Sequence, residues 1–207
     1  MVIYYWKDLI DGMIPSDCTL LYCYCNELDE LPELPQTLKI LYCYNNNLSS
    51  LPELPQTLIH LDCNYNNINS LPKLPQTLQY LECSGNSLNE LPELPQTLKF
   101  LYCSNNKLNE LPKLPQILTH LDCRYNKLNE LPELPQTLKK LNCCNNNLSS
   151  LSKLSQTLEY LDCRNNNIKY LSYENCQIIK KLVEINVLNN PFSANFTANK
   201  KFISSLE

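Results

Sequence analysis

Residues 38–57 read LKILYCYNNNLSSLPELPQT, and most of the chain is built from copies of this segment. Cysteine recurs at every twentieth residue from Cys23 to Cys163, and asparagine does the same from Asn26 to Asn166. A fixed period of this length predicts a solenoid, because one unit is too small to bury its own apolar face and must stack on its neighbours. Seven further copies begin at Cys18, Leu58, Leu78, Leu98, Leu118, Leu138 and Leu158.

Each unit contains a short strand, a turn and a segment in which proline prevents a helix. Leu41 and Cys43 alternate with outward-facing residues, which is the pattern of a half-buried strand. Asn46 follows at the turn, where its amide can pair with backbone groups. Pro52 and Pro55 fix φ and disfavour the α conformation in the residues before them. The sequence therefore predicts a parallel sheet on one side of the solenoid and an extended, helix-poor opposite side.

The segment Leu38-x-x-Leu41-x-Cys43-x-x-Asn46-x-Leu48 resembles the leucine-rich repeat consensus. The twenty-residue length with Leu-Pro-x-Leu-Pro is similar to the repeats of bacterial type III effectors. The cysteines and the many asparagines resemble repeat proteins of giant amoeba-infecting viruses. The resemblance covers residues 18–192. It implies an α/β-type repeat solenoid, mostly parallel β, that is right-handed and has a concave parallel sheet. It also implies a protein partner, with host-cell proteins as the natural class.

The ends of the chain depart from the repeat. We expect an N-terminal cap (1–17), eight repeats (18–181), and a degenerate final repeat with a C-terminal cap (182–207). The register shifts by four residues after Leu171, and the proline-free stretch before the final copy can hold a short helix. Apolar side chains at both ends are expected to cover the open core. These are Ile3, Tyr5, Trp6 and Ile10 at one end, and Phe196, Phe202, Ile203 and Leu206 at the other.

Composition narrows the class of partner. The formal charge is −4, and 17 basic against 21 acidic side chains with no basic run argue against nucleic acid. No apolar stretch approaches the ~18 to 20 residues that cross a bilayer, and the first residues do not read as a secretory signal. A column of free cysteines requires a reducing compartment. We therefore expect a soluble, monomeric chain in the cytoplasm, or in the host-cell cytoplasm if it is viral or injected, without a membrane partner.

The cysteine column is expected to be reduced, buried and free of metal, because free cysteine behaves as a small hydrophobe. Zinc sites use short local spacings such as C-x2-C, and a disulfide between in-register parallel strands would be strained. Metal binding and redox chemistry remain lesser alternatives. Cys25 and Cys144 lie outside the column, and we expect them to be exposed.

Three positions in each repeat project onto the predicted concave face: the residues before and after the second leucine, and the residue after the cysteine. Aromatic side chains and arginine, which interface hot spots favour, are frequent there. In the middle of the solenoid an aromatic centre is flanked by charged groups. The predicted partner-binding residues are His60, Asp62, Tyr80, Glu82, Phe100, Tyr102, His120, Asp122 and Arg124.

Two pairs on this face, His60 with Asp62 and His120 with Asp122, are of a kind that serves base catalysis or metal binding. They lie three strands apart, ~14 Å at sheet spacing, and an open surface excludes water poorly. The effectors that the chain resembles often carry a ubiquitin-ligase domain, and the 15 residues after Phe192 are too few to hold one. We expect a non-catalytic protein–protein interaction module without cofactor or metal. The alternative is a structural, self-associating spacer or particle component.

Overall fold

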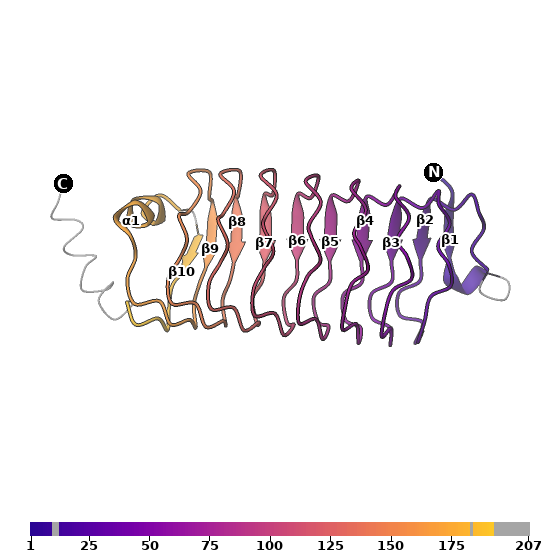
Figure 1. Cartoon of the computed structure of the whole chain (residues 1–207), viewed down its shortest axis with the longest axis horizontal. Helices are drawn as coiled ribbons and strands as arrows, with labels where there is room; N and C mark the ends of the chain where they lie inside the picture. The colour runs from indigo at the N-terminus through magenta and orange to yellow at the C-terminus, as the bar shows by residue number, and fades with distance from the viewer. Residues whose placement is uncertain (10–12, 183, 193–207) are drawn as a thin grey trace.

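The computed structural model describes residues 1–9, 13–182 and 184–192, and these form an elongated solenoid (Figure 1). Ten parallel strands lie in one sheet in chain order, each paired with the next. This arrangement confirms the predicted fold class. The strands are β1 (Ile3–Tyr5), β2 (Leu20–Tyr22), β3 (Ile40–Tyr42), β4 (His60–Asp62), β5 (Tyr80–Glu82), β6 (Phe100–Tyr102), β7 (His120–Asp122), β8 (Lys140–Asn142), β9 (Tyr160–Asp162) and β10 (Glu184–Asn186).

The sheet register repeats the sequence period. Leu41 lies opposite Leu61, so equivalent residues of successive repeats are neighbours. Between β9 and β10 the step is four residues longer, and Leu161 lies opposite Ile185 as the shifted register predicts. The short helix α1 (Tyr173–Ile179) lies in this longer segment, and the hydroxyl of Ser172 caps its first turn.

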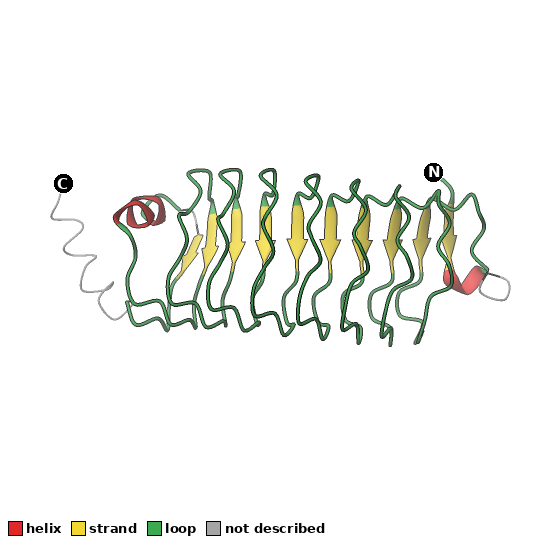
Figure 2. Cartoon of the chain, viewed as in Figure 1, coloured by secondary structure: helices red, strands yellow, loops and turns green. Residues whose placement is uncertain are grey.

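The side opposite the sheet is extended (Figure 2). In the described part of the chain the helices are α1 and the 3-10 turn η1 (Trp6–Asp8), which lie near the two ends. No helix there is long and apolar enough to cross a membrane. In a typical repeat Leu54 and Pro55 are buried, and the Pro55 carbonyl accepts a hydrogen bond from the amide of Leu58 at 3.0 Å. The prolines thus pack against the core and set the turn that returns the chain to the sheet.

One hydrophobic core runs the length of the solenoid, from Cys18 to Phe192. The inward residues of each strand, such as Leu41 and Cys43, are fully buried. Burial of a leucine side chain stabilises a fold by about 1.5–3 kcal/mol. Because every repeat contributes the same inward side chains, this term is spread evenly along the molecule.

The recurring asparagines join successive repeats through their side chains. Nδ2 of Asn106 donates to the carbonyl oxygens of Cys83 and Cys103 at 3.0 and 3.2 Å. Its Oδ1 accepts the amide of Leu88 at 3.0 Å. One carboxamide therefore satisfies backbone groups of two repeats, and the predicted hydrogen-bond ladder is confirmed. Its asparagines are buried in some repeats, such as Asn46 and Asn146, and half-buried in others, such as Asn106.

A second ladder, of threonines, was not predicted. Oγ1 of Thr57 lies 2.7 Å from the carbonyl oxygens of both Gln36 and Leu38, which belong to the preceding repeat. Five more threonines make the same contact: Thr37, Thr77, Thr97, Thr137 and Thr157. Their recurrence at every twentieth residue was the available signal. Ile117 interrupts the ladder and is partly exposed.

The first residues extend the sheet instead of folding over its end. Tyr4 of β1 lies opposite Leu21 and packs against the core with Trp6. The prediction that Ile3 and Tyr5 face the core is wrong: both are exposed, because neighbours alternate in a strand and Tyr4 points inward. The prediction for Trp6 is confirmed. The other predicted cap residues lie outside the described residues, namely Ile10, Phe196, Phe202, Ile203 and Leu206.

We expect Asn106→Ala to lower the free energy of unfolding by about 1–3 kcal/mol, because it leaves buried backbone groups unpaired. Asn47→Ala is the matched control, since Asn47 is exposed, and it should change stability by less than about 0.5 kcal/mol. Urea denaturation followed by circular dichroism measures both. Equal losses at the two sites would contradict the ladder.

Candidate functional site

The predicted partner-binding residues come together on the outward side of β4 to β7, which we call the strand face. The register places these residues in two parallel columns on four neighbouring strands, with Arg124 just beyond the end of β7. The first column is His60, Tyr80, Phe100 and His120, and the second is Asp62, Glu82, Tyr102 and Asp122.

The first column is a continuous stack of rings. The ring centroids of His60 and Tyr80 are 5.1 Å apart, those of Tyr80 and Phe100 4.4 Å, and those of Phe100 and His120 4.7 Å. Parallel strands lie ~4.8 Å apart, so the sheet itself brings equivalent rings to stacking distance. The rings are held by one another and by the backbone before any partner arrives.

The stack continues toward the first strand along the second column. Tyr5 stacks on Tyr22 at 5.0 Å, and Tyr22 on Tyr42 at 5.2 Å. Tyr42 then meets the ring of His60 edge-on at 5.1 Å, so the run changes column between β3 and β4. The sequence showed the aromatic enrichment, but not that the rings form one connected run.

Beside the rings lies a cluster of polar groups. Nε2 of His60 is 3.1 Å from Oε1 of Glu82, and Nδ2 of Asn64 donates to the other carboxylate oxygen at 3.3 Å. Asp62 is only 8% exposed, and it accepts the amide of Asn64 at 3.1 Å. Burial raises the pKa of Asp62 to about 6, and the hydrogen bond from Asn64 opposes this rise. Glu82 is therefore the more accessible carboxylate of the two.

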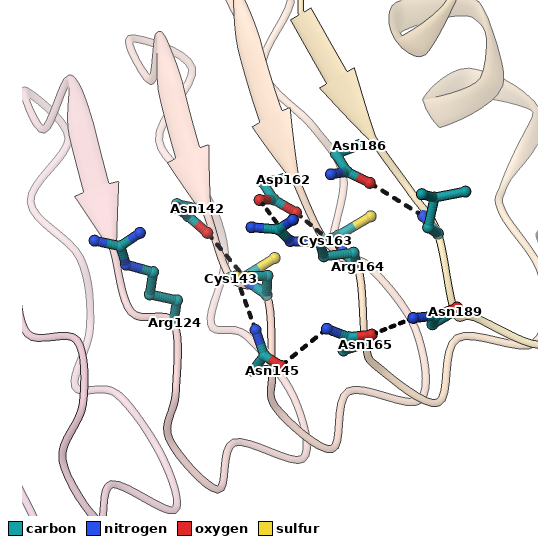
Figure 3. A network of polar contacts seen from close by, with 12 residues as sticks. Arg124, Asn142, Cys143, Asn145, Asp162, Cys163, Arg164, Asn165, Asn186 and Asn189 are labelled. Carbon is teal, nitrogen blue, oxygen red and sulfur yellow. Dashed lines mark hydrogen bonds and ion pairs between the residues drawn. The ribbon is translucent and has the colours of Figure 1, made fainter.

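On β7 the two predicted charges pair with each other. Nε of Arg124 is 3.3 Å from Oδ2 of Asp122. Burial raises the pKa of Asp122, and the hydrogen bond and charge of Arg124 oppose the rise. Arg164 and Asp162 repeat the pair at 3.2 Å (Figure 3). This arrangement holds the arginine side chains in one orientation while leaving them partly exposed.

Each histidine contacts a group other than the aspartate of its own strand. His60 meets Glu82, whereas Nδ1 of His120 is 2.9 Å from Oγ1 of Thr119. Burial and the nearby Lys140 lower the pKa of His120, which keeps it neutral near pH 7. Among the described residues no group of three or more His, Cys, Asp or Glu side chains is placed to hold a metal ion.

The strand face contains a hollow of about 380 Å³ that extends beyond the predicted patch. Tyr102, His120 and Asp122 line one part of it, as predicted residues. Lys140, Tyr160 and Glu184 line the rest, together with Leu121 and Asn142, and sequence reasoning missed them as site residues. The first two continue the outward column of the repeats. Glu184 reaches the site only because the register shift places β10 beside β9.

The cysteine column is buried throughout, and all twelve cysteines of the chain, each within the described residues, are free thiols. Burial raises the pKa of Cys83 and Cys103 well above the ordinary value. Cys25 is exposed, as predicted. The prediction for Cys144 is wrong, because this residue is fully buried. The side-chain amide nitrogen of Asn145 lies 3.3 Å from the sulfur of Cys144.

Solved structures place this geometry among known proteins. YopM from Yersinia enterocolitica WA-314 is 40% identical over 86% of this chain and 39% of its own, with a TM-score of 0.81. This chain is a leucine-rich repeat protein. A Shigella effector leucine-rich repeat domain is 28% identical over 84% of this chain and 82% of its own, with a TM-score of 0.65. The sequence matches no protein-family model and no curated protein.

The functional domain of InlJ from Listeria monocytogenes includes a cysteine ladder. It is 30% identical over 75% of this leucine-rich repeat chain and 36% of its own, with a TM-score of 0.63. The present chain thus spans well under half the length of both YopM and the InlJ domain.

The raised pKa of Asp62 predicts a pH dependence of stability. The folded-state pKa of about 6 exceeds the ordinary 3.8, so the folded protein binds the proton more tightly than the unfolded chain. This contribution is complete below pH 4 and is lost as the pH rises to about 6.5. We expect Asp62→Asn to be more stable than the native protein at pH 7.5, by about 1–3 kcal/mol, and equal to it at pH 3. Denaturation midpoints across this range test the prediction, and Glu93→Gln on the exposed opposite side is the control, expected to keep the native slope.

Thiol labelling of native protein should modify Cys25 first and leave Cys144 as slow as Cys83, because burial protects both. Peptide mapping after brief exposure to iodoacetamide gives the order. Early modification of Cys144 would contradict its burial.

Proposed function

We propose that this leucine-rich repeat chain is a non-catalytic binding module that holds a protein partner through its strand face. The observation that supports this most is the ring stack from His60 to His120. Aromatic side chains dominate interface energies, and these are already fixed by their neighbours. A partner therefore orders few side chains on this face when it binds.

The composition around the rings also fits an interface. Glu82 and the Asp122–Arg124 pair flank the aromatic centre, which matches an apolar anchor with a charged rim. Both histidines contact groups that hold them in place, and the face is open to water. This environment favours recognition over chemistry.

The likeness to the Shigella effector domain supports a host-cell protein as the class of partner. A reducing cytoplasm fits the column of buried free thiols and the exposed thiol of Cys25. We therefore propose a cytoplasmic location, in the host cell if the protein is delivered there.

The test begins with capture of partners from cell lysate on native protein and on a Tyr80/Phe100/Tyr102 triple alanine variant. A partner that only the native protein retains is then purified and its affinity measured by calorimetry. We expect Phe100→Ala and Tyr102→Ala each to weaken binding by about 1–4 kcal/mol. Glu93→Ala and Lys113→Ala, exposed on the opposite side, should leave the affinity unchanged. A partner that loses affinity only with the latter pair would show that the binding face is wrong.

Self-association is the competing role, and it would use a different surface of the molecule. It would depend on the exposed residues near β1, such as Met1, Val2 and Ile3, instead of the rings. Sedimentation velocity of the native protein distinguishes the two roles. A monomer across the concentration range supports the binding module, whereas assembly that Ile3→Lys abolishes would support the structural role.

A further inference from the structure

A second hollow lies at one edge of the strand face, where the chain turns after β4 to β7. Its volume is about 390 Å³. Tyr65 and Tyr125 stand at its two ends, and Ser84, Gly85 and Ser104 line it between them. Arg124 contributes the one charged side chain of the lining. We call it the rim pocket.

The two tyrosines occupy a backbone position that disfavours them. Both have φ of 53°, in the left-handed region where a bulky side chain is an outlier. Five other repeats carry asparagine or glycine there, namely Asn45, Gly85, Asn105, Asn145 and Asn165, and the first repeat carries Cys25. Strain of this kind gathers at functional sites. The tyrosines are also exposed, Tyr65 by 63% and Tyr125 by 53%.

Gly85 is needed for the position of Tyr65. A Cβ atom on Gly85 would lie 2.6 Å from Cδ1 of Tyr65, so the tyrosine ring lies over the glycine of the next repeat. Ser84 and Ser104 deepen the hollow, because the same position holds a large side chain in other repeats, such as Tyr44 or Arg164. These three small residues lie between the two tyrosines and give the pocket its depth.

Tyr125 also stops a ladder of asparagines that runs along the same edge. Asn165 donates to Asn145 at 2.9 Å, and Asn189 donates to Asn165 at 2.6 Å (Figure 3). An asparagine at position 125 would continue this ladder toward Asn105. The tyrosine therefore gives up both a relaxed backbone and a ladder contact, and in return it presents an aromatic wall to the pocket.

The two aromatic walls indicate the ligand. They stand on repeats three strand spacings apart, ~14 Å, and the ring of Tyr65 overlies Gly85 of the next repeat. A polyproline II helix repeats every three residues, or ~9.3 Å, and aromatic-lined grooves bind it. It can therefore lie along the hollow with prolines against the rings. Its backbone carbonyls are free, and the Ser84 hydroxyl and the exposed Asn105 amide can donate to them.

The positive charge around the rim pocket favours acidic residues beside the prolines of the ligand. Arg124 lines the pocket, and Lys107 and Lys127 follow Asn105 and Tyr125 two residues later in the exposed turns. We propose that the rim pocket binds a proline-containing, extended segment of a protein partner that carries an acidic residue. This rests on the proposed function, because it names one segment of the partner. Arg124 belongs to both surfaces, but Gly85 and Tyr125 belong to the rim pocket alone, so variants at these two positions test it apart from the strand face.

The probe is a fluorescein-labelled peptide of six prolines flanked by two aspartates at each end, titrated by fluorescence anisotropy. We expect saturable binding that Tyr125→Asn and Gly85→Ala each weaken by about tenfold or more. Tyr125→Asn should also raise the melting temperature, because asparagine tolerates the left-handed backbone. If Tyr125→Asn binds the peptide more weakly and also melts at a higher temperature, the lost affinity comes from the pocket and not from unfolding.

Tyr170→Asn is the matched control, since this tyrosine is exposed and lies outside the pocket, and Phe100→Ala tests independence from the strand face. Both should bind the probe within about twofold of native protein. The proposal is overturned by absence of saturable binding at ~1 mM peptide, or by native affinity of Tyr125→Asn. Equal binding of a glycine–serine peptide with the same aspartates, or of the proline peptide with lysines in their place, also overturns it.

Discussion

The hydrogen bonds that join each asparagine to the neighbouring repeat are the constraint on which the rest of the structure depends. Each turn leaves backbone groups inside the solenoid, and an unpaired buried group costs about 1–3 kcal/mol. The carboxamide of Asn106 satisfies Leu88 and Cys83 in one repeat and Cys103 in its own. Only a step of one whole repeat brings these groups together. Stacking and register are therefore fixed by the same contact, and no repeat can shift without breaking it.

A fixed register inside the solenoid produces a fixed surface outside it. Because equivalent residues sit one strand spacing apart, a column of rings is brought to stacking distance by the backbone alone, as the 4.4 Å between Tyr80 and Phe100 shows. The side opposite the sheet is also built from few residues, because the Leu-Pro segments fill the core without a helix. The fold thus offers a rigid row of side chains whose identities change while the frame stays constant.

The features that follow from the twenty-residue period could be predicted from the sequence. The burial of individual side chains, which depends on contacts between neighbouring repeats, could not. The leucine and cysteine columns and the asparagine ladder follow from one repeat, so they were predictable. The burial of Cys144 was not, because the position after the column cysteine is exposed or half-buried in most other repeats. The same holds for Asp62, which is buried beside the charge of Glu82. Tyr4 points inward because the first residues form a strand, although they contain no copy of the repeat.

Positions that deviate from the repeat point to function only when the deviation also builds a surface feature. Loss of stability alone does not distinguish them. Ile117 replaces a threonine of the ladder and is exposed, so it removes a hydrogen bond between repeats. It lowers the stability of the solenoid and lines neither of the two hollows. Tyr65 and Tyr125 also weaken the frame, since both hold a left-handed backbone. Yet Gly85 is fitted to the first of them, and the two enclose a hollow between them. A strained tyrosine whose ring packs on a glycine of the next repeat requires matching residues at two positions. A single random substitution in one repeat would not produce this arrangement.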